Sequence, residues 1–204
     1  MRYNSVMSVL ANIQIFEWLF IVGGYLAGSI SAAILVCRLM GLSDPRLEGS
    51  KNPGATNVMR LHGKQAAIIT LLGDVFKGVL PVLIARWVDA GYEVQILVGI
   101  TAFLGHLYPI YFGFKGGKGV ATAYGVLFAL DWRLGLACGA TWIAIFALKR
   151  ISSLAALTAF LLLPLYSWLL GRSMFMTLAC ALVSVLIYWR HRSNIRLLLS
   201  GEEK

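Results

Sequence analysis

The chain has 204 residues, of which 59% are hydrophobic and 13% are charged, and its mean hydropathy is +0.77. Soluble domains are about half apolar and about a quarter charged, so this composition excludes an ordinary soluble domain and indicates an integral membrane protein. The net charge of +9 could suggest a nucleic-acid-binding protein, but the basic residues cluster between apolar runs, where they orient membrane proteins. We therefore expect contact with membrane lipid and no nucleic acid, in one helical bundle.

The N-terminal extension, residues 1–14, carries Arg2 and precedes the first apolar run. No plain small-residue cleavage site of a signal peptide follows it, so we expect the run to remain as a first span. Residues 15–204 are then expected to form a single transmembrane domain.

Seven apolar runs follow one another, and the fourth and fifth are short. A full crossing takes about 20 residues. The sequence therefore predicts an all-α polytopic bundle, with seven spans if both short runs cross and five if they form one re-entrant element. The runs are Ile15–Met40, Gln65–Trp87, Val94–Phe112, Lys118–Leu130, Leu134–Leu148, Ser152–Leu170 and Ser173–Trp189.

The basic residues decide the predicted orientation. With the N-terminus outside, 13 of the 18 Lys and Arg residues fall in inner loops, which predicts a cytoplasmic C-terminus; the five-span alternative gives the same result. The polar loop 41–64, the FKGGKG loop and the C-terminal tail then share the cytoplasmic face, which predicts one shared site. The 13 residues are Arg38, Arg46, Lys51, Arg60, Lys64, Lys115, Lys118, Lys149, Arg150, Arg190, Arg192, Arg196 and Lys204.

The longest polar segment is GLSDPRLEGSKNPGATNVMRLHGK, residues 41–64. Arginines, short hydroxyl and amide side chains, and N–H groups that glycine leaves accessible are the components of phosphate sites. An ordinary positive-inside loop is the plain alternative, but it does not explain the density of glycine and hydrogen-bonding residues in GSKNPGATN. The candidate phosphate-site residues here are Arg46, Gly49, Ser50, Asn52, Gly54, Thr56, Asn57 and Arg60.

The second polar segment, FKGGKG, is not a Walker A loop, because Gly119 follows the Gly-Lys pair and Phe112 takes the place of the leading glycine. It can still form a nest of backbone N–H groups around an anion, with two lysines closing over it. A tight turn with interfacial anchor lysines is the alternative. The candidate residues are Lys115, Gly116, Gly117, Lys118 and Gly119.

The remaining polar candidates lie in the tail and inside two spans. His191 and Asn194 are three residues apart, on one face of a helix, and the histidine could act as an acid, a base or a hydrogen-bond donor to phosphate. A simple end to the last span is the alternative. Asp74 and Lys77 predict either an intramembrane site or, as we favour, a self-neutralising structural pair. His106 is expected to pack within the bundle.

Several kinds of chemistry have no signature in the sequence. The motifs HxxxxD, GxSxG and HExxH are missing, as are acidic clusters that could hold a metal. Cys37, Cys138 and Cys180 lie in apolar stretches without CxxC spacing, so we expect packing residues rather than disulfides or zinc ligands. The predicted site is cationic, polar and metal-free, with no cofactor.

Five segments in order make the chain resemble the bacterial acyl-phosphate:glycerol-3-phosphate acyltransferase family (PlsY), from about Ala27 to Glu203. They are GSISAAILVCRL, DPRLEGSKNPGATNVMR, GDVFKGVLP, GHLYPIYFGFKGGKGVATAYG and HRSNIRLLLSGEE. The resemblance implies a multi-pass inner-membrane enzyme that transfers a fatty acyl group from acyl phosphate to the 1-hydroxyl of glycerol 3-phosphate, giving lysophosphatidic acid. It also implies no acyl-CoA, no acyl carrier protein and no metal, and functional coupling to acyl-phosphate synthesis and to the next acyltransferase.

The resemblance also implies residue roles. The essential serine and arginine of the first loop fall on Ser50 and Arg60, and the phosphate loop falls on residues 116–119. The third motif falls on His191 and Asn194, and the family's structural glutamate falls on Glu203.

Two positions depart from the family pattern. Lys51 stands where the family has glycine, which raises the question of how that loop turns. Arg196 precedes Leu197, one place earlier than the family's tail arginine, which questions a role for it.

Both substrates implied by the resemblance are phosphorylated, so cationic loops at the membrane surface suit both headgroups. We expect Ser50, Asn52 and Asn194 to hydrogen-bond phosphate or carbonyl oxygens. Arg60 and Lys118 are expected to bear the phosphate charge, and His191 to assist the acceptor hydroxyl or its phosphate. A small transporter or channel for an organic phosphate is the rival function, but a permeation path would place polar residues at several depths. A non-catalytic scaffold leaves GSKNPGATN unexplained.

Overall fold

The computed structural model describes residues 13–203, so the expected extension, residues 1–14, lies outside the described part except for its last two residues. Within residues 13–203 the chain forms ten α-helices and one short 3-10 helix, with no strand. This confirms the all-α prediction. The helices are α2 Glu17–Gly28, α3 Ala32–Leu39, α4 Ala55–His62, α5 Lys64–Trp87, α6 Tyr92–Leu107, η1 Ile110–Phe112, α7 Val120–Leu130, α8 Trp132–Lys149, α9 Ser152–Leu169, α10 Met174–Arg190 and α11 Arg192–Ser200.

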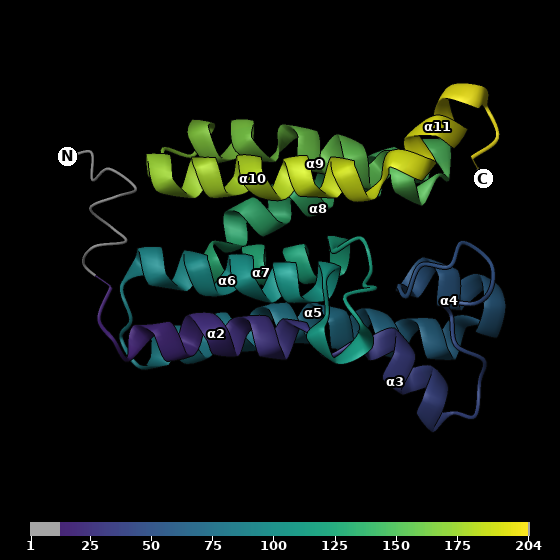
Figure 1. Ribbon diagram of the computed structural model, residues 1–204. Coiled ribbons are helices and arrows are strands. Elements are labelled where there is room, and N and C mark those ends of the chain that lie inside the picture. The colour runs from purple at the N-terminus through teal and green to yellow at the C-terminus, as the bar shows by residue number, and fades with distance from the viewer. Residues whose placement is uncertain (1–12, 204) are drawn as a thin grey trace.

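The long helices pack in two groups. In Figure 1, α8, α9 and α10 lie across the top, and α2, α5, α6 and α7 lie below them. The short helices α3, α4 and α11 lie together at the right-hand end, where the chain also ends. The three polar segments singled out in the sequence therefore lie at the same end of the bundle.

Three helical segments are long and apolar enough to cross a membrane: α5, α9 and the α6–η1 segment Tyr92–Phe112. The count rises to five if the bent pairs α2–α3 and α10–α11 each form one span. Of the two short runs, one becomes α7, with 11 residues, and the other becomes α8, with 18. Since α7 is shorter than a full crossing of about 20 residues, the seven-span count stays a prediction, as does the orientation.

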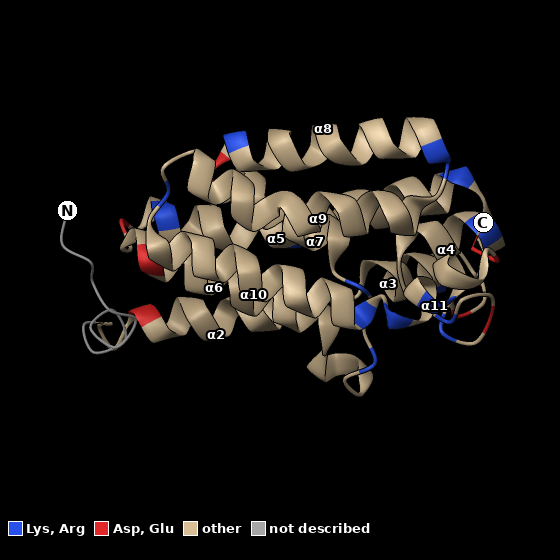
Figure 2. Ribbon diagram, turned by 90° about the horizontal axis from the view of Figure 1, so that it is seen from above, with Lys and Arg blue, Asp and Glu red and all other residues tan. Residues whose placement is uncertain are grey.

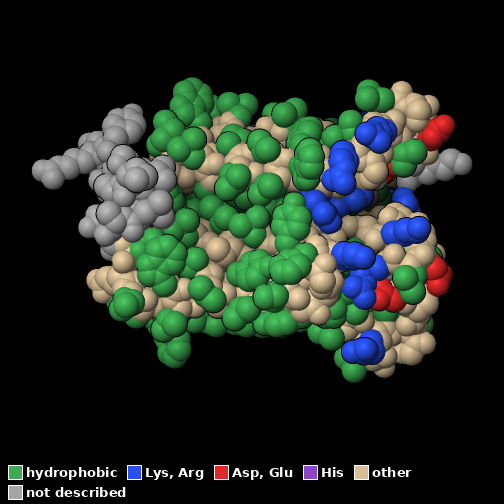
Figure 3. Space-filling model, in the orientation of Figure 1, with side chains coloured by type: hydrophobic (Ala, Val, Ile, Leu, Met, Phe, Trp, Pro, Cys, Tyr) green, Lys and Arg blue, Asp and Glu red, His purple; other side chains and the backbone are tan. Residues whose placement is uncertain are grey.

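Apolar side chains cover the middle of the bundle from outside. Phe76, Leu161 and Val185 lie in the middle of helices, yet 60% to 65% of each is exposed. Figure 3 shows hydrophobic side chains over most of this surface, with Lys and Arg gathered at the end that carries α3, α4 and α11, and Figure 2 shows the helix middles almost uncharged. Soluble proteins rarely expose so much contiguous apolar surface, which fits a lipid-facing bundle.

The first apolar run is broken rather than continuous. It was expected as one span, Ile15–Met40, but α2 ends at Gly28 and α3 begins at Ala32, bent by 46°. The hydroxyl of Ser31 accepts a hydrogen bond from the N–H of Ile34 at 3.5 Å and so caps the start of α3. The break places α3 and the following polar loop beside the site.

The short helix α7 is held at its C-terminal end by an arginine. The guanidinium of Arg86 on α5 donates hydrogen bonds to the carbonyls of Ala129, at 2.5 Å, and Leu130, at 3.3 Å. These are carbonyls that a helix end leaves without partners. Asp131 then caps α8 and forms an ion pair with Arg172 at 2.5 Å. Polar contacts therefore close the turn between α7 and α8.

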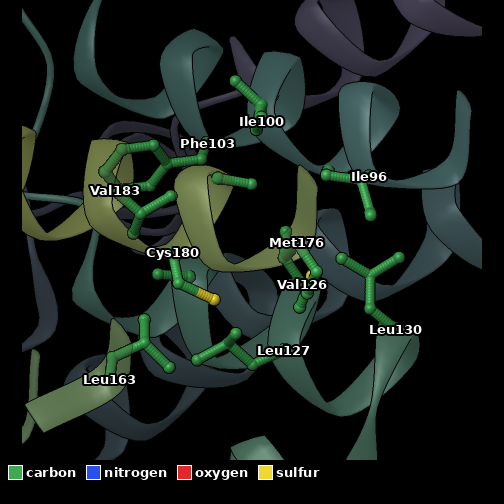
Figure 4. Close-up of a pocket in the computed structure, with 13 residues that line it drawn as sticks. Ile96, Ile100, Phe103, Val126, Leu127, Leu130, Leu163, Met176, Cys180 and Val183 are labelled. Carbon is green, nitrogen blue, oxygen red and sulfur yellow. The ribbon is translucent and has the colours of Figure 1, made fainter. Parts of the chain in front are cut away.

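The interior between α6, α7, α9 and α10 is closely packed. Figure 4 shows the remaining void, of about 20 Å³, lined only by apolar and thiol-bearing side chains such as Phe103, Leu127 and Cys180. A void of this size and polarity stays dry. All three cysteines are buried as free thiols, which confirms that they are packing residues.

Candidate active site

A cavity of about 310 Å³ opens at the end of the bundle that carries α4 and α11. It brings the three predicted polar segments together from distant parts of the chain, which confirms that they meet. The predicted site residues that line it are Ser50, Asn52, Gly54, Thr56, Asn57, Arg60, Lys118, Gly119, His191, Asn194 and Glu203.

The side-chain amide of Asn57 holds the first loop, residues 41–64, by hydrogen bonds to its backbone. Its Oδ1 accepts the N–H of Ser50 at 2.9 Å, and its Nδ2 donates to the carbonyls of Pro45 and Glu48 at 2.8 and 3.2 Å. The side chain is almost fully buried, so its polar atoms hold the loop. Gly49 has a φ of +58°, and a Cβ on it would lie 2.5 Å from Oδ1 of Asn57. Asn57 and Gly49 therefore fix the position of Ser50.

The same loop leads into α4, whose N-terminus lies at the cavity. Gly54 is the N-cap of α4, and the first residues of this helix line the cavity wall together with Arg60. Backbone N–H groups at a helix N-terminus attract anions. This wall therefore has the features of an anion site, and its role in binding a phosphate stays a prediction.

Lys51 adopts a backbone conformation that glycine favours. Its φ is +56°, in the left-handed region that is costly for residues with a Cβ. The loop therefore makes the left-handed turn that a glycine would favour, with some backbone strain. Its side chain is exposed.

The second loop, residues 113–119, is held by hydrogen bonds from an arginine at the end of α10. The guanidinium of Arg190 donates to the carbonyl of Gly117 at 3.0 Å and to that of Gly116 at 2.6 Å. The N–H of Gly117 is also used, since it donates to the carbonyl of His106 at 3.1 Å. Gly116 and Gly117 are outside the cavity lining. The anion-binding nest expected here is thus partly occupied by contacts within the protein, and Lys118 is the side chain that reaches the cavity.

Two predicted basic residues, and the predicted Gly49, also lie outside the cavity lining. Arg46 forms an ion pair with Asp44 at 2.6 Å, and its guanidinium lies over the ring of Phe112 at 5.9 Å. Arg46 lowers the pKa of Asp44 through this hydrogen bond. Lys115 is exposed. The structure therefore places both cations at the rim of the loops, not in contact with the cavity.

A continuous set of hydrogen bonds links the second loop, the tail and α9. Nζ of Lys118 donates to Oδ1 of Asn194, and Nδ2 of Asn194 donates to Oε1 of Glu203 at 2.6 Å. The hydroxyl of Ser153 donates to the same oxygen at 2.7 Å. Glu203 thus holds the Asn194 amide with its oxygen toward the lysine.

Burial governs the charge states in this cavity. Lys118 lies in the loop before α7, and its burial lowers its pKa to about 8, although the Glu203 carboxylate opposes this shift. The ammonium is therefore mostly protonated at pH 7. Burial, followed by the charge of Lys118, lowers the pKa of His191 at the end of α10 to about 4, so its imidazole is neutral at pH 7.

The neutral imidazole has a defined tautomer. Nδ1 of His191 lies 2.8 Å from the carbonyl oxygen of Ile187, which can only accept a hydrogen bond. The proton is therefore on Nδ1, and Nε2 carries the lone pair. This nitrogen can accept a hydrogen bond from a hydroxyl group.

Other cavity-lining residues were not singled out as site residues from the sequence. Ser152, Ser153, Tyr124 and Trp142 carry no motif signal, because their presence depends on how α7, α8 and α9 pack. Arg190 could have been suspected, since it adjoins the histidine of the third motif. Among residues 13–203, no group of three or more His, Cys, Asp and Glu residues is placed to hold a metal ion.

The two intramembrane candidates meet at the wall of this cavity. Nζ of Lys77 lies 2.8 Å from Oδ1 of Asp74, and both side chains are buried, which confirms the predicted pair. His106 is buried beside them, as expected, and both it and Asp74 line the cavity.

The arrangement can bind an anion and orient a nucleophile. Arg60 and Lys118 supply positive charge, Ser50 and Asn52 supply polar groups, and the neutral His191 supplies an acceptor. Fixed donors around developing negative charge are the usual means of stabilising an acyl-transfer transition state.

Comparison with known proteins gives a consistent result. A family model described as glycerol-3-phosphate acyltransferase matches residues 18–201. The glycerol-3-phosphate acyltransferase of Methylococcus capsulatus is 54% identical over 187 residues, covering 92% of this chain and 94% of that one. The protein of the same name from Thioalkalivibrio sulfidiphilus is 56% identical over 183 residues, covering 90% of each chain.

Solved structures give the same match. The crystal structure of PlsY, an integral membrane glycerol 3-phosphate acyltransferase, in its glycerol 3-phosphate form superposes with a TM-score of 0.88 at 39% identity, covering 93% of this chain and 94% of that one. Its lysophosphatidic acid form gives a TM-score of 0.86 at 38% identity, with the same coverage.

Proposed function

Since the chain belongs to the glycerol-3-phosphate acyltransferase family, we propose that its acyl donor is acyl phosphate. It transfers the fatty acyl group to the 1-hydroxyl of sn-glycerol 3-phosphate and releases lysophosphatidic acid and inorganic phosphate. Relatives of known structure hold glycerol 3-phosphate and lysophosphatidic acid, which supports this acceptor and this product. The observation that carries the proposal is the single cavity where Ser50, Lys118 and His191 meet.

The chemistry needs positioning more than a strong base. The acceptor hydroxyl attacks the acyl carbonyl carbon, a new C–O ester bond forms, and the C–O bond to phosphate breaks. The hydroxyl proton passes to a phosphate oxygen, because the leaving phosphate is itself basic enough to take it. Nε2 of His191 accepts a hydrogen bond from the hydroxyl and orients it, while the ammonium of Lys118 and the guanidinium of Arg60 neutralise phosphate charge.

The apolar part of the cavity suits the acyl chain. Leu71, Val120, Ala121 and Trp142 line the wall toward the helix bundle, beside the polar residues. The carbonyl would then lie at the boundary between the apolar and polar parts, within reach of Ser50 and Asn52.

We place the protein in the bacterial inner membrane with the cavity at the cytoplasmic face. The excess of Lys and Arg in the loops at that end supports this orientation. The donor and the product are amphiphilic, so the enzyme is expected to work between the reaction that makes acyl phosphate and the acyltransferase that uses lysophosphatidic acid.

A transporter for an organic phosphate is the second candidate, but the polar groups argue against it. The buried charges Asp74 and Lys77 pair with each other beside the cavity. Beyond the cavity, the interior between α6, α7, α9 and α10 retains a void of only about 20 Å³, which supports a closed site rather than a path.

Purified protein in lipid vesicles tests the proposal. Palmitoyl phosphate and labelled glycerol 3-phosphate should give labelled lysophosphatidic acid, and palmitoyl-CoA in a parallel reaction should give none. Product from palmitoyl-CoA alone would overturn the donor assignment. Uptake of labelled glycerol 3-phosphate into sealed vesicles without product would favour transport.

A further inference from the structure

Three buried polar side chains near the cavity have no part in the mechanism above. They are Asp74 and Lys77 on α5 and His106 on α6. Nδ1 of His106 lies 3.5 Å from Oδ1 of Asp74, whose other neighbour, Nζ of Lys77, lies at 2.8 Å. Within residues 13–203, Nδ1 of His106 has no hydrogen-bond partner, and its 3.5 Å approach to the Asp74 carboxylate is an electrostatic contact.

The far side of the imidazole faces the second loop. A methyl group on Gly117 would lie 2.2 Å from Nε2 of His106 and 2.9 Å from its Cε1. Cβ atoms do not approach other atoms this closely, so the loop can lie here only because residue 117 has no side chain. A backbone hydrogen bond joins the same two residues, since the N–H of Gly117 donates to the carbonyl of His106 at 3.1 Å.

The opposite side of the loop is held by Arg190, which binds the carbonyls of Gly116 and Gly117. The loop is therefore clamped between the imidazole on α6 and the guanidinium on α10. Lys118 is the next residue, and its ammonium reaches Asn194 in the cavity. A shift of Gly117 would move the base of this side chain directly.

The support extends to the break between α2 and α3. Nζ of Lys77 donates a hydrogen bond to the carbonyl of Ile30 at 2.8 Å, in the segment that separates the two helices. The Asp74–Lys77 pair on α5 therefore contacts α6 through His106 and the break between α2 and α3 through Ile30. An anchored pair gives His106 a fixed orientation rather than one of several rotamers.

We propose that His106, oriented by the Asp74–Lys77 pair, is a positioning residue that sets the place of Lys118 in the cavity through its contact with Gly117. This inference rests on the proposed function, because it assigns a role within that reaction. Misplacing a phosphate-binding group by about 1 Å can cost about 10²-fold in rate. The His106 ring fits against residue 117 only because that residue has no side chain. A smaller side chain at position 106 should therefore make room for a methyl group at position 117.

A double-mutant cycle tests the proposal. Gly117→Ala should lower kcat/KM by about 10²-fold, because the new methyl group clashes with the ring and displaces the loop. His106→Asn removes Nε2 and Cε1 but keeps a polar group toward Asp74, and should cost about tenfold. The double variant should regain about tenfold over Gly117→Ala, which is a coupling that independent sites do not show.

Gly116→Ala is the matched control. Its methyl group would lie 2.1 Å from the backbone carbonyl oxygen of His106 and 2.6 Å from that of Leu107, so shortening the imidazole gives it no room. His106→Asn should leave its defect unchanged. Equal rescue of both alanine variants would overturn the proposal.

Thermal unfolding of each purified variant separates positioning from folding. His106→Asn should keep a melting temperature near that of the wild type and show its loss in kcat/KM per folded molecule. A full kcat/KM in that variant, or a recovery in the double variant that only follows the folded fraction, would overturn the proposal. If Gly117→Ala gives no folded protein, restored folding in the double variant supports the contact, and unrestored folding overturns it.

The wild-type reaction keeps the two conclusions distinct. A wild-type protein that makes no lysophosphatidic acid from acyl phosphate overturns the proposed function and this inference together. An active wild type without rescue overturns this inference alone.

Discussion

The ammonium of Lys118 donates a hydrogen bond to Oδ1 of Asn194, which lies 76 residues further along the chain. The same amide donates through Nδ2 to Glu203, so its orientation is fixed from the opposite side. Lys118 is thereby held in the cavity before a substrate arrives. Preorganised charge of this kind acts without a cost of reorientation during the reaction.

Removing this charge should mainly affect catalysis. We expect Lys118→Ala to lower kcat/KM by about 10²-fold or more, and Ser50→Ala, which removes a hydroxyl of the first loop, by about tenfold or more. The measurement is initial rates of lysophosphatidic acid formation over a range of both substrates. Lys149→Ala, which removes an exposed lysine at the end of α8, is the control and should change rates less than threefold. Near-normal constants in both site variants would contradict the proposed site.

The partly buried Lys118 predicts opposite pH effects on activity and stability. Activity requires the charged ammonium, so it should fall as the pH rises through about 8, the lowered pKa of Lys118. Between this value and the usual 10.5, the unfolded chain binds a proton that the native protein does not. The contribution of this residue to stability should therefore rise with pH over the same window.

A variant with a permanent charge checks the assignment. Arginine stays protonated throughout this range, so Lys118→Arg, at whatever rate it retains, should lose the alkaline decline near pH 8. Rates are measured between pH 6 and 10 after subtraction of uncatalysed acyl phosphate hydrolysis. An unchanged decline in this variant would assign the transition to another group.

Glu203 is expected to act on the fold of the tail and, through it, on the site. Glu203→Ala leaves the Asn194 amide and the Ser153 hydroxyl without their shared acceptor, and should cost about 2 kcal/mol of stability. It should also raise KM, because Asn194 is then free to turn. Thermal unfolding and kinetics check both effects. The exposed neighbour Glu202 is the matched control, and Glu202→Ala should change neither.

The sequence predicted which loops meet, because the pattern of positive charge indicated that they share one side of a membrane and short polar residues mark them. It did not predict what holds them. Ser153 and Glu203 are 50 residues apart, and Arg190 and Gly116 are 74 apart. Hydrophobic periodicity predicts helices but not which loop another loop will touch. Gly116 and Gly117 were interpreted as anion-binding glycines, yet their close contacts are with α6.

The number and lengths of the spans were harder to predict for a different reason. The length of α5 follows directly from its apolar run, but α7 is short and depends on Arg86 to satisfy its last carbonyls. That contact joins residues more than 40 positions apart and leaves no local signal in the sequence. The break between α2 and α3 was missed for a related reason, because Ser29, Ile30 and Ser31 interrupt the run without a charge or a proline.

Lys51 offers a test of backbone strain beside the proposed site. Its φ of +56° lies in the left-handed region, which costs a residue with a Cβ about 1 kcal/mol or more. Lys51→Gly should therefore raise the thermal stability by about 1 kcal/mol, less the chain entropy that glycine adds to the unfolded state. Lys51→Ala is the control, since it removes the same charge but keeps the strain, and it should give no gain. If both variants stabilise the protein equally, the charge of the lysine rather than its backbone conformation is the destabilising feature. Because Ser50 is held by Asn57 independently of residue 51, we expect kcat/KM of Lys51→Gly to stay within about threefold of the wild type.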